Sequence, residues 1–143
     1  MHIRPLNDGV AVSPQIAPGD LPAVKAAGYA LLVNNRPDGE EPGQPSGAAI
    51  RAAAQAAGLD YAEVPVGPAG IGHAELDAMT AALTRAEGPA LAFCRSGTRS
   101  CHLWALAAAK AGRDPELLER QAAAAGYDLS GLRPTLDALA SDA

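Results

Sequence analysis

Short apolar runs alternate with longer alanine-rich segments along the chain. The apolar runs predict strands at residues 10–13, 29–34, 61–66 and 90–93, and the run at 29–34 is nearly continuous, as in a strand buried on both faces. The alanine-rich segments predict helices at 18–27, 46–57, 73–87, 100–111 and 132–140, with a further helix opening at 114–116. Because each later strand follows a helix, the order predicts a three-layer α/β fold, with a mostly parallel central sheet and helices on both faces.

The composition predicts one domain, residues 1–143, built around a single core. Apolar residues make up 48% of the chain and aromatic residues only 3%, so the core is expected to consist of alanine, leucine, valine and isoleucine. A net charge of −5 without a basic run argues against nucleic acid or an anionic membrane surface as a partner. No apolar stretch reaches the roughly 18 residues of a membrane span, and the start does not resemble a secretion signal, so we expect a cytoplasmic protein.

The strongest candidate chemistry follows the strand at 90–93, where Cys94-Arg95-Ser96-Gly97-Thr98-Arg99 leads into a predicted helix. Ligands of parallel sheets bind beyond the carboxyl ends of the strands, and Cys94 falls at such an end. Gly97 permits the positive φ with which successive backbone N–H groups converge on one point, and the start of the helix adds the positive end of its dipole. The segment therefore predicts an anion-binding loop that also stabilises the thiolate of Cys94 as a nucleophile.

The other residues of this segment have expected roles around a bound anion. Arg99 can clamp two oxygens of the anion at once, and Arg95 helps to hold it. Ser96 and Thr98 can donate hydroxyl hydrogen bonds to the sulfur anion. Ser100 can serve the leaving group, or it can cap the helix, which is the commoner task of a serine at such a position.

The alternative interpretation is that Cys94 is a small buried apolar residue and that the arginines are surface charge. The order of strand, cysteine, glycine-containing loop, arginines and helix favours a functional site instead. Cys101 lies inside the following helix, where we expect a thiol of the core. The three histidines show no metal-ligand spacing, so neither a metal nor an organic cofactor is expected.

Several stretches of residues 5–112 form a specific pattern together with the cysteine segment. They are Ser13-Pro14-Gln15, Asn34-Asn35-Arg36-Pro37-Asp38-Gly39-Glu40, Ala57-Gly58-Leu59, Pro65-Val66, Gly88-Pro89 and Phe93-Cys94-Arg95-Ser96-Gly97-Thr98-Arg99-Ser100. In these stretches the chain resembles the phosphatase-like domain of the beta-lactamase-hydrolase-like proteins. The resemblance implies the fold of the cysteine-dependent phosphatases, with the nucleophile in the loop after the last parallel strand.

The spacing within the loop bears on the reaction. Tyrosine and dual-specificity phosphatases place five residues between the cysteine and the clamping arginine, whereas four residues separate Cys94 from Arg99. A Cys-x4-Arg loop is similar to the active loop of single-domain rhodaneses, whose cysteine carries a transferable sulfane sulfur. Cleavage of a phosphate ester usually needs a general acid, and the loop 67–72 contains no carboxylate.

The leading prediction is therefore a sulfurtransferase, in which Cys94 takes sulfur from thiosulfate or a small persulfide, and a partner enzyme of sulfur metabolism would fit this activity. The alternative is a phosphatase-like hydrolase of phosphate esters, in which Cys94 forms a cysteinyl phosphate and Asp38 protonates the leaving group. Asp38 lies in a turn sequence, where such a side chain usually bonds its own backbone. Arg36 either adds positive charge over the anion or pairs with Glu40 or Glu41. A third hypothesis is a non-catalytic anion-binding module.

Overall fold

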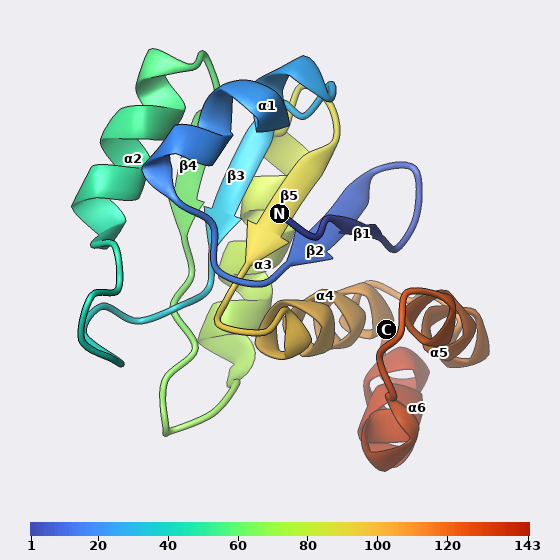
Figure 1. Cartoon of the computed structure of the whole chain (residues 1–143). Coiled ribbons are helices and arrows are strands. Elements are labelled where there is room, and N and C mark those ends of the chain that lie inside the picture. Colours follow the sequence, from blue (N-terminus) through green and yellow to red (C-terminus); the bar gives the residue numbers. More distant parts are fainter.

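The computed structural model describes residues 1–143 and contains a five-stranded sheet with helices on both faces (Figure 1). The strands are β1 (Arg4–Pro5), β2 (Val10–Ser13), β3 (Leu31–Asn34), β4 (Asp60–Glu63) and β5 (Ala90–Phe93), in the order β1-β2-β5-β3-β4. Neighbouring strands pair in parallel, except that β1 pairs antiparallel with β2. The predicted three-layer, mostly parallel α/β fold is confirmed.

The predicted helices are present, with small shifts at their ends. They are α1 (Leu21–Ala26), α2 (Gly47–Ala56), α3 (His73–Arg85), α4 (Thr98–Lys110), α5 (Pro115–Ala124) and α6 (Arg133–Ser141), and short 3-10 turns, η1 (Pro18–Asp20) and η2 (Ser130–Leu132), precede α1 and α6. Ser46 caps α2 by accepting a hydrogen bond from the backbone N–H of Ala49 at 3.1 Å. No helix combines the length and apolar character needed to cross a membrane.

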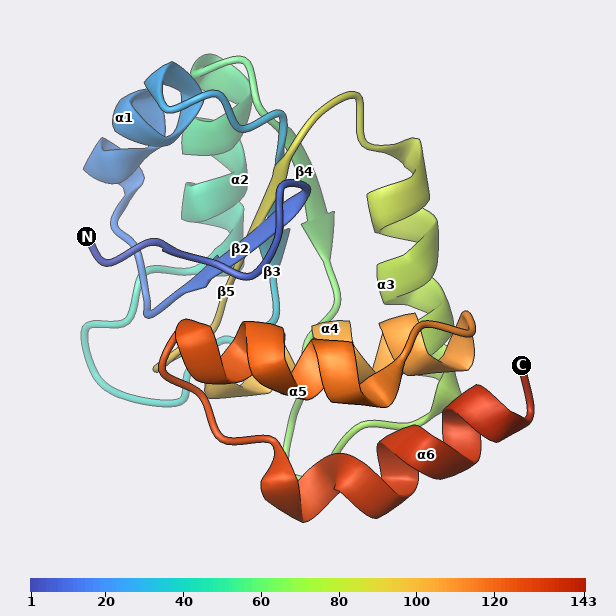
Figure 2. The ribbon, with the colours of Figure 1, turned by 90° about the vertical axis from the view of Figure 1, so that its right-hand side faces the viewer.

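The sheet separates two apolar clusters, because successive side chains of a strand point to opposite faces. Leu32, Leu91 and Phe93 belong to the cluster that includes residues of α1 and α2, whereas Val33 and Ala92 belong to the cluster that includes α3 to α6. Figure 2 shows α1 and α2 on one side of the sheet and α3 on the other. Strands covered on both faces explain why their sequence is apolar without alternation.

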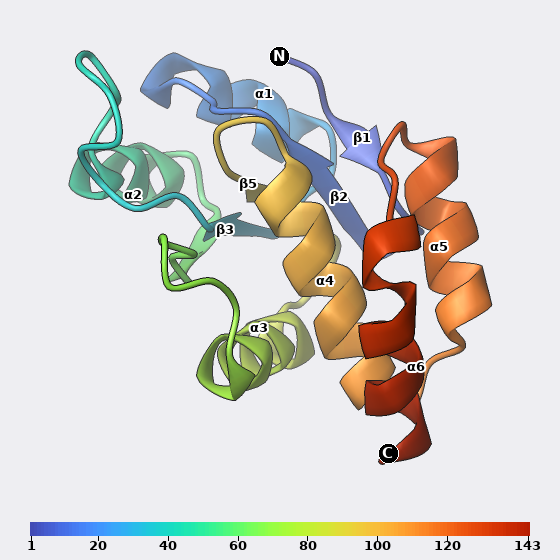
Figure 3. The ribbon, with the colours of Figure 1, turned by 90° about the horizontal axis from the view of Figure 1, so that it is seen from below.

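Helix α4 is the central helix of its layer. It contacts α3, α5 and α6, and the view from below shows α3 on one side of it and the two C-terminal helices on the other (Figure 3). Cys101, Leu103 and Trp104 are among its buried residues. The packing fixes the direction of α4, and therefore the place where its first turn meets the carboxyl end of β5.

Candidate active site

Cys94 lies at the base of a loop between β5 and α4. Gly97, at the N-cap of α4, has a φ of +90°, and its backbone N–H donates to Sγ of Cys94 at 3.1 Å. Cys94 itself is 0% exposed, whereas Arg95, Ser96 and Thr98 on the outside of the loop are exposed. The sulfur therefore lies beneath the loop, next to a backbone N–H donor and the first turn of α4.

Arg99 is held beside this loop by Glu40. Its Nη1 donates to Oε2 of Glu40 at 2.7 Å and to the carbonyl oxygen of Val66 at 2.8 Å, and its Nη2 donates to Oε1 of Glu40 at 2.8 Å. These contacts raise the pKa of Arg99; the hydrogen bond with Glu40 is the largest cause, and the charge of Cys94 adds to it. The Nε–H and the second Nη2 hydrogen of Arg99 are the donors that these bonds leave for an anion.

Arg36 is the second cation bound to Glu40, and it is buried, with 3% of its surface exposed. Its Nε donates to Oε1 of Glu40 at 2.8 Å, its Nη2 to Oε1 of Glu41 at 2.9 Å and its Nη1 to Oε1 of Gln15 at 3.0 Å. Hydrogen bonds from Arg99, first, and from Arg36 lower the pKa of Glu40 to about 2. Of the two roles predicted for Arg36, the structure shows the pairing with both glutamates, in the interior rather than at the surface.

Arg95 differs from the other two arginines because it faces solvent. Its side chain is 67% exposed, and its Nη2 lies 3.7 Å from Oε2 of Glu41. At this separation and exposure the ion pair holds Arg95 only weakly. Arg95 is therefore an exposed positive charge at the rim of the loop, directly after Cys94 in the chain.

The hydroxyl groups of the loop bond to partners other than the sulfur. Oγ of Ser96 donates to Oγ1 of Thr98 at 3.1 Å and accepts the backbone N–H of Thr98 at 3.4 Å. Oγ of Ser100 donates to Oδ1 of Asn35 at 2.7 Å, and Nδ2 of Asn35 donates to the carbonyl oxygen of Val64 at 2.9 Å. Ser100 is buried in the first turn of α4, where it ties this helix to the segments that follow β3 and β4.

Asp38 lies at the start of α2. Its Oδ1 accepts the backbone N–H of Gly47, the first residue of that helix, at 2.7 Å. Tyr61 and Glu63 of β4 adjoin the same turn, since the hydroxyl of Tyr61 donates to Oε1 of Glu63 at 2.8 Å and lies 3.3 Å from the carbonyl oxygen of Gly47. Asp38 therefore satisfies a free N–H at a helix N-terminus, on the β4 side of the sheet.

Tyr127, which follows α5, also contacts the loop, although no role was predicted for it. Its hydroxyl donates to the carbonyl oxygen of Ser96 at 3.3 Å, and a Cβ atom added to Gly97 would collide with this hydroxyl. The guanidinium of Arg4 lies over the ring of Tyr127, 5.7 Å from its centroid, and donates to the carbonyl oxygen of Ala125 at 3.0 Å. Neither the contact of Tyr127 with Ser96 nor that of Glu40 with Arg99 has a local sequence signal, because the partners are 31 and 59 positions apart in the chain.

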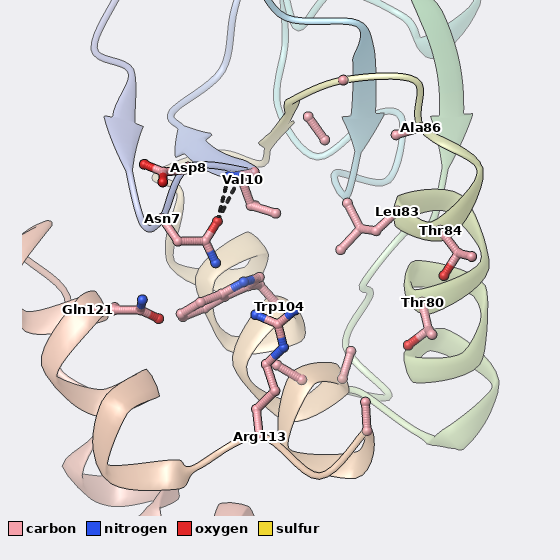
Figure 4. A pocket seen from close by; sticks show the side chains of 16 residues that line it. Asn7, Asp8, Val10, Thr80, Leu83, Thr84, Ala86, Trp104, Arg113 and Gln121 are labelled. Atoms are coloured by element: carbon pink, nitrogen blue, oxygen red, sulfur yellow. Dashed lines mark hydrogen bonds between the residues drawn. The ribbon is translucent and has the colours of Figure 1, made fainter.

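A cavity of about 640 Å³ lies at the opposite edge of the sheet (Figure 4). Val10 and Ala90, which begin β2 and β5, line it together with Trp104, Arg113 and Gln121. Cys94 follows the last residue of β5, so the length of the strands separates this cavity from the loop. The chemistry of the loop therefore does not depend on it.

Comparison with known proteins places this arrangement in a family. Residues 2–111 match the family model of the beta-lactamase hydrolase-like protein, phosphatase-like domain. The chain belongs to this family. A beta-lactamase hydrolase-like protein of Agrobacterium fabrum is 40% identical over 108 residues, which are 76% of this chain and 25% of that protein. The chain thus spans a quarter of the length of this relative of the beta-lactamase hydrolase-like family.

Solved structures agree with the family membership. A candidate phosphatase from Neisseria meningitidis has 33% sequence identity and a TM-score of 0.84, over 97% of this chain and 99% of that one. Tk-PTP in its active form has a TM-score of 0.70 over 99% of this chain and 97% of its own, at 16% identity, which shows a shared fold. The resemblance to the phosphatase-like domain and the cysteine-phosphatase-like fold that it implied are confirmed.

Proposed function

We propose that the chain is a phosphatase-like hydrolase, in which Cys94 takes the phosphoryl group of a small anionic substrate and water then releases it as phosphate. The observation that supports this most directly is the fixed orientation of the Arg99 guanidinium. Glu40 and Val66 occupy one edge of its guanidinium, and the remaining donors belong to the edge formed by Nε and Nη2. A guanidinium fixed in this way can bind two phosphate oxygens at once without first losing side-chain freedom.

Family membership favours the phosphatase over the leading prediction of sulfur transfer. The matching family is described as phosphatase-like, the relative from Neisseria meningitidis as a candidate phosphatase, and no protein compared above bears the name of a sulfurtransferase. The observation in favour of sulfur transfer is the spacing of four residues between Cys94 and Arg99. Sulfur transfer through a Cys94 persulfide is therefore the second candidate, and the experiment has to separate the two.

The test uses purified protein with p-nitrophenyl phosphate and, separately, with thiosulfate. We expect hydrolysis of the phosphate ester, a fall in turnover of more than about 10³-fold in Cys94→Ser, and a phosphoryl adduct on Cys94 after acid quenching. Cys101→Ala is the matched control: burial raises the pKa of Cys101 to about 12, so this thiol remains protonated and its removal leaves turnover in place. Both cysteines are free and buried, so the contrast between the two variants is not one of exposure.

Three other outcomes would contradict the proposal. A reductant-sensitive mass gain of one sulfur atom on Cys94, without phosphate release, would establish the sulfurtransferase. Binding of inorganic phosphate without turnover of either compound would establish the anion-binding module. Equal turnover in Cys94→Ser and the unaltered protein would remove the nucleophile from the reaction.

A further inference from the structure

The carboxylates that touch the Cys94 loop are already paired with cations. Glu40 receives hydrogen bonds from both Arg99 and Arg36, and Glu41 accepts one from Arg36 at 2.9 Å and lies 3.7 Å from Arg95. These contacts lower the pKa of both glutamates, with the hydrogen bond from Arg99 the largest cause for Glu40 and that from Arg36 the largest for Glu41. A general acid must carry a proton before it can give one, so neither glutamate serves a leaving group at neutral pH.

Asp38, the remaining candidate acid, accepts a hydrogen bond at the start of α2, beside β4. It accepts the N–H of Gly47 at 2.7 Å, next to Tyr61 and Glu63 of β4. Strand β3 lies between β4 and β5, and Cys94 follows β5. Asp38 therefore stabilises the start of α2, and β3 lies between the strand at this contact and the strand that leads to Cys94.

At the rim of the loop, the group available to the leaving group is the positive charge of Arg95, not a proton donor. Arg95 follows Cys94 directly, its side chain is 67% exposed, and its only ion pair is the 3.7 Å contact with Glu41. A guanidinium in this position stabilises negative charge that develops on the departing oxygen but cannot protonate it. The site is therefore matched to leaving groups that are stable as anions.

Building on the proposed function, we propose that the substrates are phosphoric anhydrides, in which the transferred phosphoryl group is joined to a carboxylate or to a second phosphate. Sγ of Cys94 forms a bond to phosphorus while the phosphorus–oxygen bond to the leaving group breaks, and the leaving group keeps the electron pair and departs as an anion. Water then attacks phosphorus, the sulfur–phosphorus bond breaks and the thiolate returns. The proton lost by water passes to the released phosphate, so water is the only co-reactant.

The experiment measures kcat/KM for a series of aryl phosphates of rising leaving-group pKa, and for acetyl phosphate, inorganic diphosphate and phosphoserine. We expect kcat/KM to fall steeply along the aryl series. After correction for the uncatalysed rates of hydrolysis, phosphoserine should be slower than acetyl phosphate or diphosphate by about 10²–10⁴-fold. This is the factor that a general acid would supply. The faster of the two anhydrides identifies whether a carboxylate or a phosphate is the leaving group. Asp38→Asn, which keeps an oxygen for Gly47, should leave the slope of the series unchanged.

The failures are distinguishable. A shallow dependence on leaving group in the unaltered protein that turns steep in Asp38→Asn would identify Asp38 as the general acid and overturn the inference, while leaving the phosphatase intact. Comparable rates for phosphoserine and the anhydrides after correction for uncatalysed hydrolysis would do the same. The absence of Cys94-dependent hydrolysis of every phosphoryl compound, acetyl phosphate included, would instead overturn the proposed function on which the inference rests.

Discussion

Two cations of the candidate site depend on Glu40. Arg99 binds both of its carboxylate oxygens, and Arg36, with 3% of its surface exposed, shares one of them. Removal of one partner from a buried ion pair leaves an uncompensated charge, which costs far more than the pair itself contributes. Glu40 therefore controls both the position of the anion-binding guanidinium and the stability of the segment that carries Arg36.

Glu40→Gln tests this dependence, because glutamine keeps the shape of the side chain but carries no charge. We expect the free energy of unfolding at neutral pH to fall by about 1–3 kcal/mol, below the full cost of a deeply buried pair because Glu40 is partly exposed. KM for p-nitrophenyl phosphate should rise, since Arg99 loses its fixed orientation. Urea denaturation and steady-state kinetics measure the two effects. Glu119→Gln is the control, because its 3.0 Å pair with Arg133 is more exposed and distant from the loop.

The same pair predicts a pH dependence with a defined sign. The pKa of Glu40 falls from 4.5 to about 2 in the folded protein, chiefly through the hydrogen bond from Arg99. A lowered folded-state pKa contributes stability that is fully present above the ordinary value and is lost as the pH falls through the folded value. The stability difference between the unaltered protein and Glu40→Gln should therefore be constant near neutrality and shrink below pH 4.5. A difference that widens on acidification would contradict this assignment.

Local order along the chain was sufficient to predict Cys94, Gly97 and their loop, because strand, nucleophile, glycine and helix are consecutive. Glu40 could not be predicted as the partner of Arg99, since 59 residues separate them and an acidic residue after a turn sequence resembles surface charge. The hydroxyl of Ser100 illustrates the same limit. Its bond to Asn35 depends on the side-by-side packing of α4 and the end of β3, which residue types alone do not specify.

Among the elements, the main differences from the sequence prediction are in the residues at which strands and helices begin and end. Strand β1 escapes prediction because two residues, Arg4 and Pro5, give no alternating pattern. Strand β4 ends at Glu63 rather than residue 66. The N–H of Val64 still donates to the carbonyl oxygen of Asn34, the last residue of β3, and that of Val66 to the carbonyl oxygen of Asn35. Helix α4 begins at Thr98 rather than residue 100, because Gly97 with its positive φ already turns the chain into the helix.

Gly97→Ala tests the turn into α4. Alanine at a φ of +90° is strained, and its Cβ would also collide with the hydroxyl of Tyr127. We expect turnover of p-nitrophenyl phosphate to be lost and thermal stability to fall. Gly112→Ala is the matched control, because Gly112 has a φ of +95° just beyond the other end of α4 and its added Cβ would make only an ordinary 3.5 Å contact with Ala143. The control should lose about 1–2 kcal/mol of stability from the backbone strain alone and keep turnover.

At the scale of the whole molecule, the loop is held by segments from both ends of the chain. The family match ends at residue 111, yet α5 and α6 pack against α4, and Tyr127 between them contacts the loop. Arg4, in the first strand, lies over the ring of Tyr127. The C-terminal segment therefore contributes both to the cover of α4, through α5 and α6, and to the surroundings of the loop, through Tyr127.

Tyr127→Phe tests whether this long-range contact positions the loop, since it removes the hydroxyl but keeps the ring over Gly97. Loss of one hydrogen bond to the carbonyl oxygen of Ser96 should lower the free energy of unfolding by about 0.5–1.5 kcal/mol. KM for p-nitrophenyl phosphate should rise while kcat changes less, because the loop amides lose their fixed direction. Tyr29→Phe is the control: Tyr29 precedes β3 and therefore lies near the amino end of this strand, whereas the loop follows the carboxyl end of β5. If both variants change KM equally, Tyr127 contributes only general stability. A shift confined to Tyr127→Phe means that a residue beyond the stretch matched by the family model, residues 2–111, sets the affinity of the loop for its anion.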